Sequence, residues 1–241
     1  MRLQQRLFAS ILVLFATAVR AAEPQAVKEV SFAAPNSVTM KLRMEGPSTA
    51  DVPLQVVCYF KYTPEGARRM TGAPVELDKE LGGVIGALRE RGEFVGDRLE
   101  TILIIPPSKS IKPKALLLIG LGNESSLSLD VMERVGKVAL REAVRLDVSH
   151  VAFAPFIRDQ GNSKLDTGEV ERAVTRGVLL AYDTEKRLQK QGLAKAFTLD
   201  AWNAEAGAAY FESTQTGLEK GIEEAKTAIA QRPAQPYGVA K

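Results

Sequence analysis

The sequence predicts an α/β fold, a three-layer α/β/α sandwich built around a mixed, largely parallel sheet. Continuous apolar runs alternate with amphipathic helical segments through the middle of the 241 residues, which is typical of parallel strands joined by helices. Near the start, two segments alternate apolar and polar side chains, as half-buried strands do. Composition is even between residues 27 and 200, so we expect one α/β domain over residues 22–200 and a helical, linker-like segment over 201–241.

The strands expected in the first half differ in their depth of burial. VKEVSFAA (27–34) and SVTMKLRM (37–44) are the alternating pair, joined by the turn signal PNS. LQVVCYF (54–60) is continuously apolar, which is typical of a strand buried on both faces. The stretch 63–74 contains two prolines and two glycines and is expected to be a loop.

Residues 77–88 have the apolar spacing of one helix but are rich in glycine. The face of that helix would comprise Leu77, Leu81, Val84, Ile85 and Leu88. Gly82, Gly83 and Gly86 each destabilise a helix by about 1 kcal/mol relative to alanine. Glycine allows a packed backbone or a ligand to come close, so Gly82 and Gly83 are candidate ligand-loop residues.

The second half alternates strands with longer helices. The expected strands are TILIIP (101–106), ALLLIG (115–120), HVAFAP (150–155) and, at an edge, KAFTLD (195–200). The expected helices cover residues 128–146, 168–190 and 217–231. Ser128 is a candidate N-cap, and Asp166 with Glu169 resembles a capping pair. Most acidic residues, Glu171 among them, are expected on exposed helix faces.

Residues 1–21 have the pattern of a secretory signal peptide. Arg2 and Arg6 precede an apolar stretch of 13 residues, Leu7 to Val19, which ends at a candidate cleavage site before Ala22. A membrane-spanning helix needs about 20 residues, so an uncleaved anchor is the alternative. We expect an exported protein, periplasmic or extracellular, with no stable membrane span after cleavage.

Charge excludes one class of partner. The formal net charge is +3, and removing residues 1–21 leaves 29 basic and 29 acidic residues. Binding to nucleic acid normally requires a clear basic excess. We therefore expect no nucleic-acid partner.

The residue types that hydrolases use are scarce in this chain. Cys58 is the single cysteine and lies within VVCYF, where a buried, unreactive thiol is expected. His150 is the single histidine and opens a predicted strand, so a structural role is expected. Without further soft ligands a zinc site is not expected, although a site made only of carboxylates stays open. We predict no catalytic residue, no metal ligand and no cofactor.

The stretch KALLLIGLGNES (114–125) raises the question of a phosphate-binding loop. Gly120 and Gly122 fit the first two positions of a dinucleotide fingerprint, but Ser125 stands where the third glycine belongs. A strand-to-helix turn is the favoured interpretation. Since open α/β sheets bind ligands at the carboxyl ends of strands, Gly120, Gly122 and Asn123 are further candidate ligand-loop residues.

These segments together resemble the N-terminal domain of the leucyl aminopeptidases, the cytosol aminopeptidase family. Four motifs match in order and spacing: Leu77-Asp78, Gly82-Gly83, Phe94-Val95-Gly96 and Gly120-Leu121-Gly122. EVERAVTRGVLLAYDTEKRL (169–188) is similar to a later helix of the family, with Arg176 where an acidic residue is common. Residues 217–236 resemble the linker helix that leads into the family's catalytic domain, so the resemblance covers roughly residues 27–236.

The resemblance implies a macro-domain-like fold and a role in packing or oligomer contacts. The family's dimetal motif, N-T-D-A-E-G-R-L, has no counterpart in these 241 residues, so no catalytic or metal residue is carried over. We expect a non-catalytic binding or assembly module that contacts itself or a protein partner through the C-terminal helix. Two alternatives stay open: a binder of nucleotide or ADP-ribose-type ligands, and part of a metal-dependent aminopeptidase completed by a partner chain.

Overall fold

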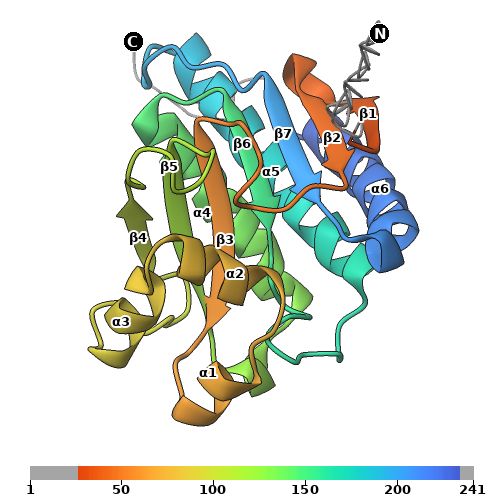
Figure 1. The fold of residues 1–241 in the computed structure, drawn as a ribbon. Helices are drawn as coiled ribbons and strands as arrows, with labels where there is room; N and C mark the ends of the chain where they lie inside the picture. The colour runs from red at the N-terminus through yellow and green to blue at the C-terminus, as the bar shows by residue number, and fades with distance from the viewer. Residues whose placement is uncertain (1–26, 234–241) are drawn as a thin grey trace, which may run out of the picture.

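A seven-stranded sheet forms the middle layer of the molecule, which a computed structural model describes over residues 27–233 (Figure 1). The strands are β1 (Glu29–Ala33), β2 (Thr39–Arg43), β3 (Leu54–Phe60), β4 (Thr101–Ile104), β5 (Ala115–Gly122), β6 (His150–Ala154) and β7 (Ala201–Glu205). Their order is β1-β2-β7-β6-β3-β5-β4. The five inner strands are parallel, and the edge strands β1 and β4 are antiparallel to their neighbours. The predicted mixed, largely parallel sheet is confirmed.

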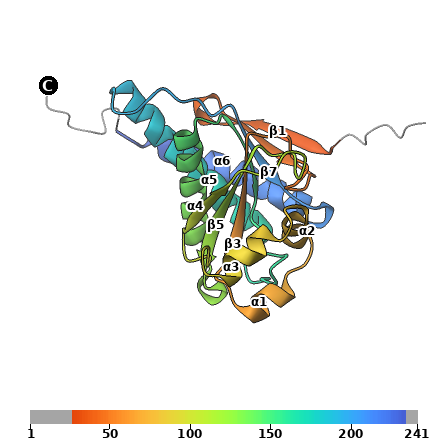
Figure 2. The same ribbon diagram turned by 60° about the vertical axis from the view of Figure 1, so that its left-hand side comes forward.

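Helices cover both faces of this sheet (Figure 2). One layer holds α4 (Leu129–Leu146), α5 (Thr167–Lys190) and α6 (Phe211–Ala230). The other holds α1 (Pro64–Arg69), α2 (Ala73–Glu80) and α3 (Val84–Glu90). Each layer has its own apolar core, the larger around Trp202 and Phe153 and the smaller around Tyr59 and Phe94. The three-layer sandwich is therefore also confirmed.

The long helices begin at the residues that their capping signals predict. Ser128 Oγ accepts a hydrogen bond from the Val131 amide at 3.4 Å, and the Asp166 carboxylate accepts one from the Glu169 amide at 3.1 Å. Side-chain oxygens at these positions satisfy amides that the first helical turn leaves unpaired. The parallel strands and these helices place the carboxyl ends of five strands at one edge of the sheet.

Two predictions for residues 63–88 were wrong, both for local reasons. The expected loop contains α1, because Thr63 Oγ1 accepts from the Gly66 amide at 2.9 Å and Pro64 stands at the first helical turn. The single helix expected over 77–88 is two helices. Gly82 and Gly83 separate them with left-handed φ angles of 72° and 81°, which glycine adopts without strain.

The last strand was also misplaced. No strand forms at residues 195–200, whereas β7 (Ala201–Glu205) lies between β2 and β6 in the interior of the sheet. Its sequence, AWNAE, has neither a continuous apolar run nor a β-branched residue, so the usual strand signals are missing. Tertiary packing sets it instead, with the Trp202 ring 5.7 Å from that of Phe153. Residues beyond 200 thus supply an interior strand and, in α6, a packed helix.

The predicted signal peptide, residues 1–21, lies outside the described residues. Between residues 27 and 233, none of the helices has the length and apolar character required to span a bilayer.

Candidate functional site

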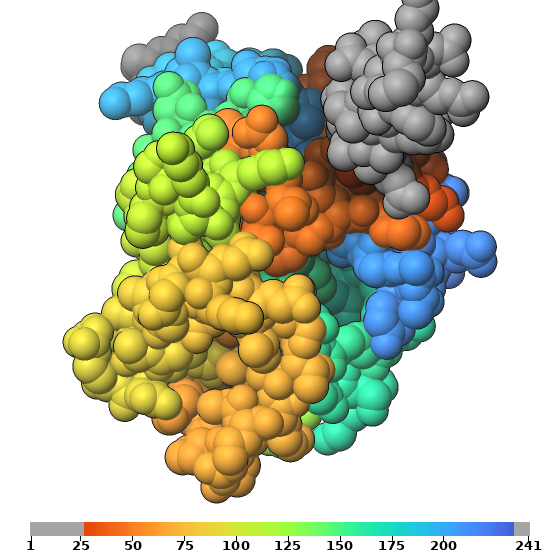
Figure 3. Space-filling model, in the orientation of Figure 1, coloured from red at the N-terminus to blue at the C-terminus, as the bar shows by residue number. Residues whose placement is uncertain are grey.

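A cavity of about 330 Å³ opens at the carboxyl ends of β6 and β7. We call it the strand-end cavity. Its lining comes from the loop after β2 (Glu45–Pro47), the loop after β6 (Pro155–Asp159), the first turns of α5 and the segment after β7 (Ala206–Tyr210). Figure 3 shows the surface hollowed where the orange loop after β2, the gold atoms near α2 and the blue segment after β7 meet.

The walls of this cavity are mainly apolar. Phe156, Ile157 and Val170 line it and are buried. Tyr210 also lines it and is 42% exposed. An apolar enclosure with a few polar groups is the usual composition of a small-molecule site.

Two buried carboxyl groups are the main polar features of the cavity. Glu171, on α5, is 3% exposed, and burial raises the pKa of its carboxyl to about 7, although Thr175 Oγ1 donates a hydrogen bond to it at 2.9 Å. Glu205 ends β7, and burial raises the pKa of its carboxyl to about 8. Gln55 Nε2 donates to Glu205 Oε2 at 3.1 Å, whereas Glu205 Oε1 is buried without a hydrogen-bond partner. Such atoms normally find a partner, so this oxygen needs an explanation.

Two further carboxyl groups lie on the same lining. Burial raises the pKa of Asp159 and of Glu45, the latter against the opposing charge of Arg43. Arg43 Nη1 lies 2.7 Å from Glu45 Oε2. Within residues 27–233, Asp159, Glu171 and Glu205 form no ion pair. The strand-end cavity is therefore acidic as well as apolar.

A second hollow, of about 340 Å³, lies at the carboxyl ends of β3 and β5 and is basic. Its lining includes Lys61, Arg69 and Arg89. The first two are paired with acids, Lys61 with Asp97 and Arg69 with Glu124. Arg89 is 4% exposed and donates to the Phe60 carbonyl at 2.9 Å, and its guanidinium group lies 4.6 Å from the centre of the Tyr59 ring.

The predicted ligand-loop residues do not come together. Asn123 lines the basic hollow, but Gly82, Gly83, Gly120 and Gly122 line neither hollow. A Cβ atom at Gly120 would lie 1.9 Å from the Asp97 carbonyl oxygen, so packing closes this strand end. Gly120 and Gly122 thus belong to a strand end packed on a neighbouring loop, and Gly82 and Gly83 to an open helix–helix turn.

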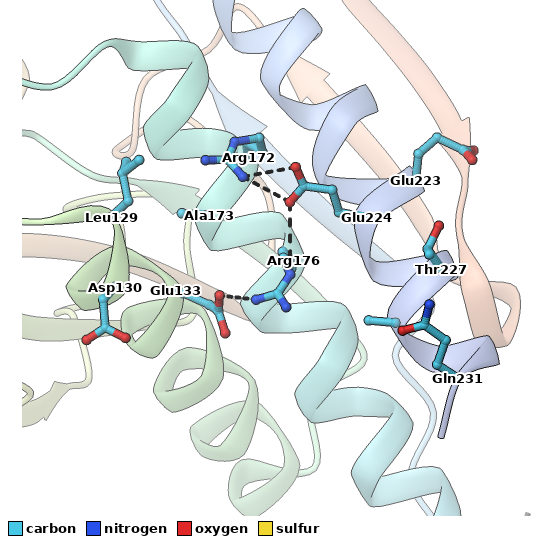
Figure 4. Close-up of a pocket in the computed structure, with 11 residues that line it drawn as sticks. Leu129, Asp130, Glu133, Arg172, Ala173, Arg176, Glu223, Glu224, Thr227 and Gln231 are labelled. Carbon is cyan, nitrogen blue, oxygen red and sulfur yellow. Dashed lines mark hydrogen bonds and ion pairs between the residues drawn. The ribbon is translucent and has the colours of Figure 1, made fainter. Parts of the chain in front are cut away.

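A third hollow, a shallow groove of about 730 Å³, crosses the outer surface of α4, α5 and α6 (Figure 4). Arg172 Nη1 lies 2.9 Å from Glu224 Oε2, and Arg176 pairs with Glu133. These charges already satisfy one another, and they tie α6 to α5 and α5 to α4. The apolar face of α6, expected to meet a partner, is instead buried within the chain at Leu218, Ile222 and Ala225. A partner of α6 must therefore use its other face.

Glu171 and Glu205 were not identified from the sequence. Glu171 was assigned to an exposed face because the predicted buried face of its helix comprised Val170, Ala173, Val174, Gly177, Val178 and Ala181. The buried face is wider than that, since Thr175, Leu179 and Tyr182 are also buried. The residue types around Glu171 do not show this extra width. No local signal marks Glu205.

The chain's cysteine and histidine lie apart from the strand-end cavity. Cys58 is fully buried in β3, as predicted, and burial raises the pKa of its thiol far above the usual range. His150 is exposed at the amino end of β6, the opposite end from the cavity, and its Nδ1 lies 3.0 Å from Ser149 Oγ. Among the described residues there is no group of three or more His, Cys, Asp or Glu side chains positioned to hold a metal ion.

Comparison with known proteins gives a consistent family match. Residues 56–192 match the model of the cytosol aminopeptidase family, N-terminal domain. A probable cytosol aminopeptidase of Thermosynechococcus vestitus is 27% identical over 128 residues, which is 53% of this chain and 24% of that protein. One of Alkaliphilus oremlandii is 27% identical over 165 residues, 66% of this chain and 30% of that protein. The chain thus spans 24% to 30% of the length of these relatives.

Solved structures with a similar fold fall into two groups. A variant of tomato leucine aminopeptidase superposes with a TM-score of 0.59 at 18% identity, over 82% of this chain and 37% of that one. The Oceanobacillus iheyensis macrodomain with ADP superposes with a TM-score of 0.55 at 12% identity, over 83% of this chain and all of that one. At these identities the likeness is one of fold, and it confirms the macro-domain-like architecture.

Proposed function

Because this chain belongs to the cytosol aminopeptidase family through its N-terminal domain, we propose that it is an exported, non-catalytic binding module of that family. Its ligand occupies the strand-end cavity. The cavity lies where open α/β sheets usually bind ligands, at the carboxyl ends of parallel strands. Its volume of about 330 Å³ is at the lower end of the range for small-molecule sites, about 300–1,000 Å³.

One observation carries this proposal. Glu205 Oε1 is shielded from solvent and has no hydrogen-bond partner among the described residues, at the wall of the acidic and apolar cavity. Leaving a buried polar atom unpaired destabilises a fold by about 1–3 kcal/mol. A ligand that donates a hydrogen bond to this oxygen removes that penalty, which favours binding.

The described residues of the cavity do not form the paired nucleophile and base of covalent catalysis. Covalent catalysis requires a nucleophile within hydrogen-bond reach of a base. The carboxyl of Glu171 is hydrogen-bonded by Thr175 and that of Glu205 by Gln55, and neither donor is an activating base. If the chain is instead part of an aminopeptidase completed by a partner, the purified protein alone should still not hydrolyse a leucine anilide, and adding the partner should restore that activity. Metal-dependent hydrolysis by the purified protein alone would contradict a non-catalytic role.

The cavity assignment is tested with a blocking variant and a matched control. Gly207 lines the cavity, is exposed, and has open space around the position of a Cβ atom, so Gly207→Trp adds a bulky side chain at the cavity wall without a clash at Cβ. Ser125→Trp places the same side chain in the basic hollow, where Ser125 is exposed. The probes are n-hexylamine, n-hexanol, hexanoate and AMP, each at millimolar concentration in a thermal unfolding assay.

We expect at least one probe to raise the unfolding midpoint, since a ligand that binds the folded state stabilises it by mass action. Gly207→Trp should remove the shift, and Ser125→Trp should retain it. A protein that responds to none of the four probes, or whose response survives in Gly207→Trp, contradicts the cavity as the binding site.

A second candidate function is binding of a phosphate-bearing ligand in the basic hollow. Arg89 lines that hollow and has no carboxylate partner among the described residues, so an anion would balance its charge, and Asn123 lies on the same lining. The Oceanobacillus macrodomain with ADP has the same fold. ADP-ribose at millimolar concentration should then raise the unfolding midpoint in the wild type and not in Ser125→Trp. An unchanged midpoint in the wild type excludes this candidate.

Export is proposed from residues 1–21, whose basic start, apolar stretch and candidate cleavage site match the pattern of a secretory signal peptide. Intact-mass measurement of the protein from its native cell should give a chain that begins at Ala22 and is found outside the cytoplasm. A full-length chain in the cytoplasmic fraction would contradict export, and a full-length chain in the membrane fraction would favour the uncleaved anchor.

A further inference from the structure

The lining of the strand-end cavity includes a hydrogen-bond acceptor without a partner, Glu205 Oε1. Two more acceptors without a partner, Gln55 Oε1 and Asn203 Oδ1, are buried on β3 and β7 outside this lining. Glu171 accepts one hydrogen bond, from Thr175. An ionised carboxylate only accepts hydrogen bonds, so the deprotonated cavity is suited to a ligand that donates them.

Charge points to the same conclusion. The groups that face the cavity from every side are Glu45 after β2, Asp159 and Arg158 after β6, Glu171 on α5 and Glu205 on β7. Arg158 is the one basic residue of this lining. It donates to the backbone carbonyls of Asn162 and Leu165, at 3.1 and 2.6 Å, and lies 5.9 Å from the Tyr210 ring. It therefore turns its donors away from the carboxyl groups. Arg43, which lies outside the lining, pairs with Glu45 at 2.7 Å, and its charge opposes the rise in the pKa of Glu205. Asp159, Glu171 and Glu205 have no ion-pair partner of their own within residues 27–233.

The apolar walls of the cavity indicate that the rest of the ligand is a hydrocarbon group. Phe156, Ile157, Val170 and Ala206 surround the space in front of the carboxyl groups. Burying an alkyl or aryl group against them is favourable by about 25 cal/mol for each Å² removed from water. A small inorganic cation would leave this apolar surface uncovered, whereas an amine with a hydrocarbon body covers it.

We propose that the strand-end cavity binds a primary ammonium group carried on an apolar body, and that Glu205, whose Oε1 lacks a hydrogen-bond partner, holds the ammonium group. An ammonium has three donors and one positive charge, which matches both the unpaired acceptor and the carboxyl groups without an ion-pair partner. This proposal rests on the proposed function, since it names the ligand class of the same cavity. Phosphate-bearing ligands are excluded from this cavity, because their oxygens are acceptors and their charge repels the carboxylates.

Binding of an amine should release protons. Burial raises the pKa of Glu171 to about 7 and that of Glu205 to about 8, so both carboxyls are largely protonated at pH 6. An alkylamine keeps its charge up to about pH 10, as a lysine side chain does. An entering ammonium therefore displaces bound protons, and affinity should rise by up to about tenfold for each pH unit and each proton released.

The test compares n-hexylamine with n-hexanol, which has nearly the same shape and no charge, by calorimetric titration of the purified full chain. We expect hexylamine to bind at least about tenfold more tightly than hexanol at pH 8, since a charge-assisted hydrogen bond contributes about 1.5–3 kcal/mol. Its affinity should rise between pH 6 and pH 8.5. Proton release should appear as a dependence of the measured heat on the ionisation enthalpy of the buffer.

Variants distinguish the loss of a carboxyl group from the loss of the folded cavity. Glu205→Gln should weaken hexylamine binding by about tenfold or more and reduce proton release, while hexanol binding stays within about twofold. Glu219→Gln, an exposed change on α6, should alter neither. Because hexanol reports on the intact cavity, a variant that merely misfolds is recognised by losing both ligands.

The outcomes distinguish this proposal from the one on which it depends. If hexanol binds as tightly as hexylamine, and Gly207→Trp removes both, the cavity is a binding site but the ammonium proposal is wrong. The ammonium proposal is equally wrong if hexylamine binds without proton release and is unaffected by Glu205→Gln. If Gly207→Trp changes neither ligand's binding, both proposals are wrong.

Discussion

Replacing Glu171 by glutamine should make the protein's stability less dependent on pH between pH 5 and pH 8. The carboxyl is 3% exposed, and burial raises its pKa from 4.5 to about 7. The folded protein therefore holds a proton that the unfolded chain releases above its ordinary pKa. The contribution of Glu171 to the free energy of unfolding is therefore largest below pH 4.5. It falls as the pH rises from 4.5 to the folded-state pKa of about 7.

The magnitude follows from the size of this shift. A change of one pKa unit corresponds to 1.36 kcal/mol. The contribution of Glu171 to the free energy of unfolding should therefore fall by about 3 kcal/mol over its whole titration, and by about 2.5 kcal/mol between pH 5 and pH 8. Glutamine does not titrate, yet it keeps the acceptor for Thr175 Oγ1. The gap between Glu171→Gln and the wild type should therefore widen in favour of the variant by about 2.5 kcal/mol over this interval.

The assay is urea unfolding at half-unit pH steps for the wild type, Glu171→Gln and the exposed control Glu219→Gln. The pKa of Glu205 is also raised by burial, so Glu205 adds a pH dependence of the same sign to all three proteins. This shared contribution cancels when the free energy of unfolding of each variant is compared with that of the wild type. Parallel curves for Glu171→Gln and the wild type from pH 5 to pH 8 would refute the assignment of Glu171 as a buried, proton-binding group. The same assignment would be refuted if the free energies of unfolding of Glu171→Gln and Glu219→Gln changed in parallel over this pH range.

Three further predictions concern packing, ion pairs and the thiol. Gly217→Ala should destabilise the protein by about 1–3 kcal/mol in urea unfolding, because the added Cβ would lie 1.9 Å from the Gly168 carbonyl oxygen; an unchanged unfolding midpoint would mean that α5 and α6 are not packed so closely. Glu224→Gln should cost no more than about 1 kcal/mol, and less at high salt, since its pairs with Arg172 and Arg176 are partly exposed; a larger, salt-independent loss would contradict this. Cys58 should react with a thiol reagent only after unfolding, because it is fully buried, and rapid labelling of the native protein would contradict its burial.

The parts of the fold that local chemistry specifies were predictable from sequence. LQVVCYF and the apolar run after Ala115 identified β3 and β5, since strands buried on both faces are apolar throughout. The caps at Ser128 and Asp166 placed the starts of α4 and α5. The family match confirms the resemblance found in the order of four short motifs.

The features that depend on tertiary packing, β7 and the strand-end cavity, were not predictable from the sequence. β7 contains Trp202 and Asn203 between alanines, and it becomes an interior strand only because β2 and β6 lie on either side of it. The strand-end cavity likewise combines a helix residue, Glu171, with a strand end, Glu205, that lies 34 positions later in the sequence. Neither carboxyl looks unusual in its own segment. The glycine loops that do look unusual, such as Gly120, are explained by close packing.

The most direct measurement of the central claim is a crystal structure of the protein soaked with n-hexylamine. The account predicts density for the amine in the strand-end cavity, with its nitrogen about 2.7–3.2 Å from a carboxylate oxygen of Glu205 and its chain against Phe156 and Val170. An empty cavity at saturating amine, or an amine bound only elsewhere on the protein, would contradict it.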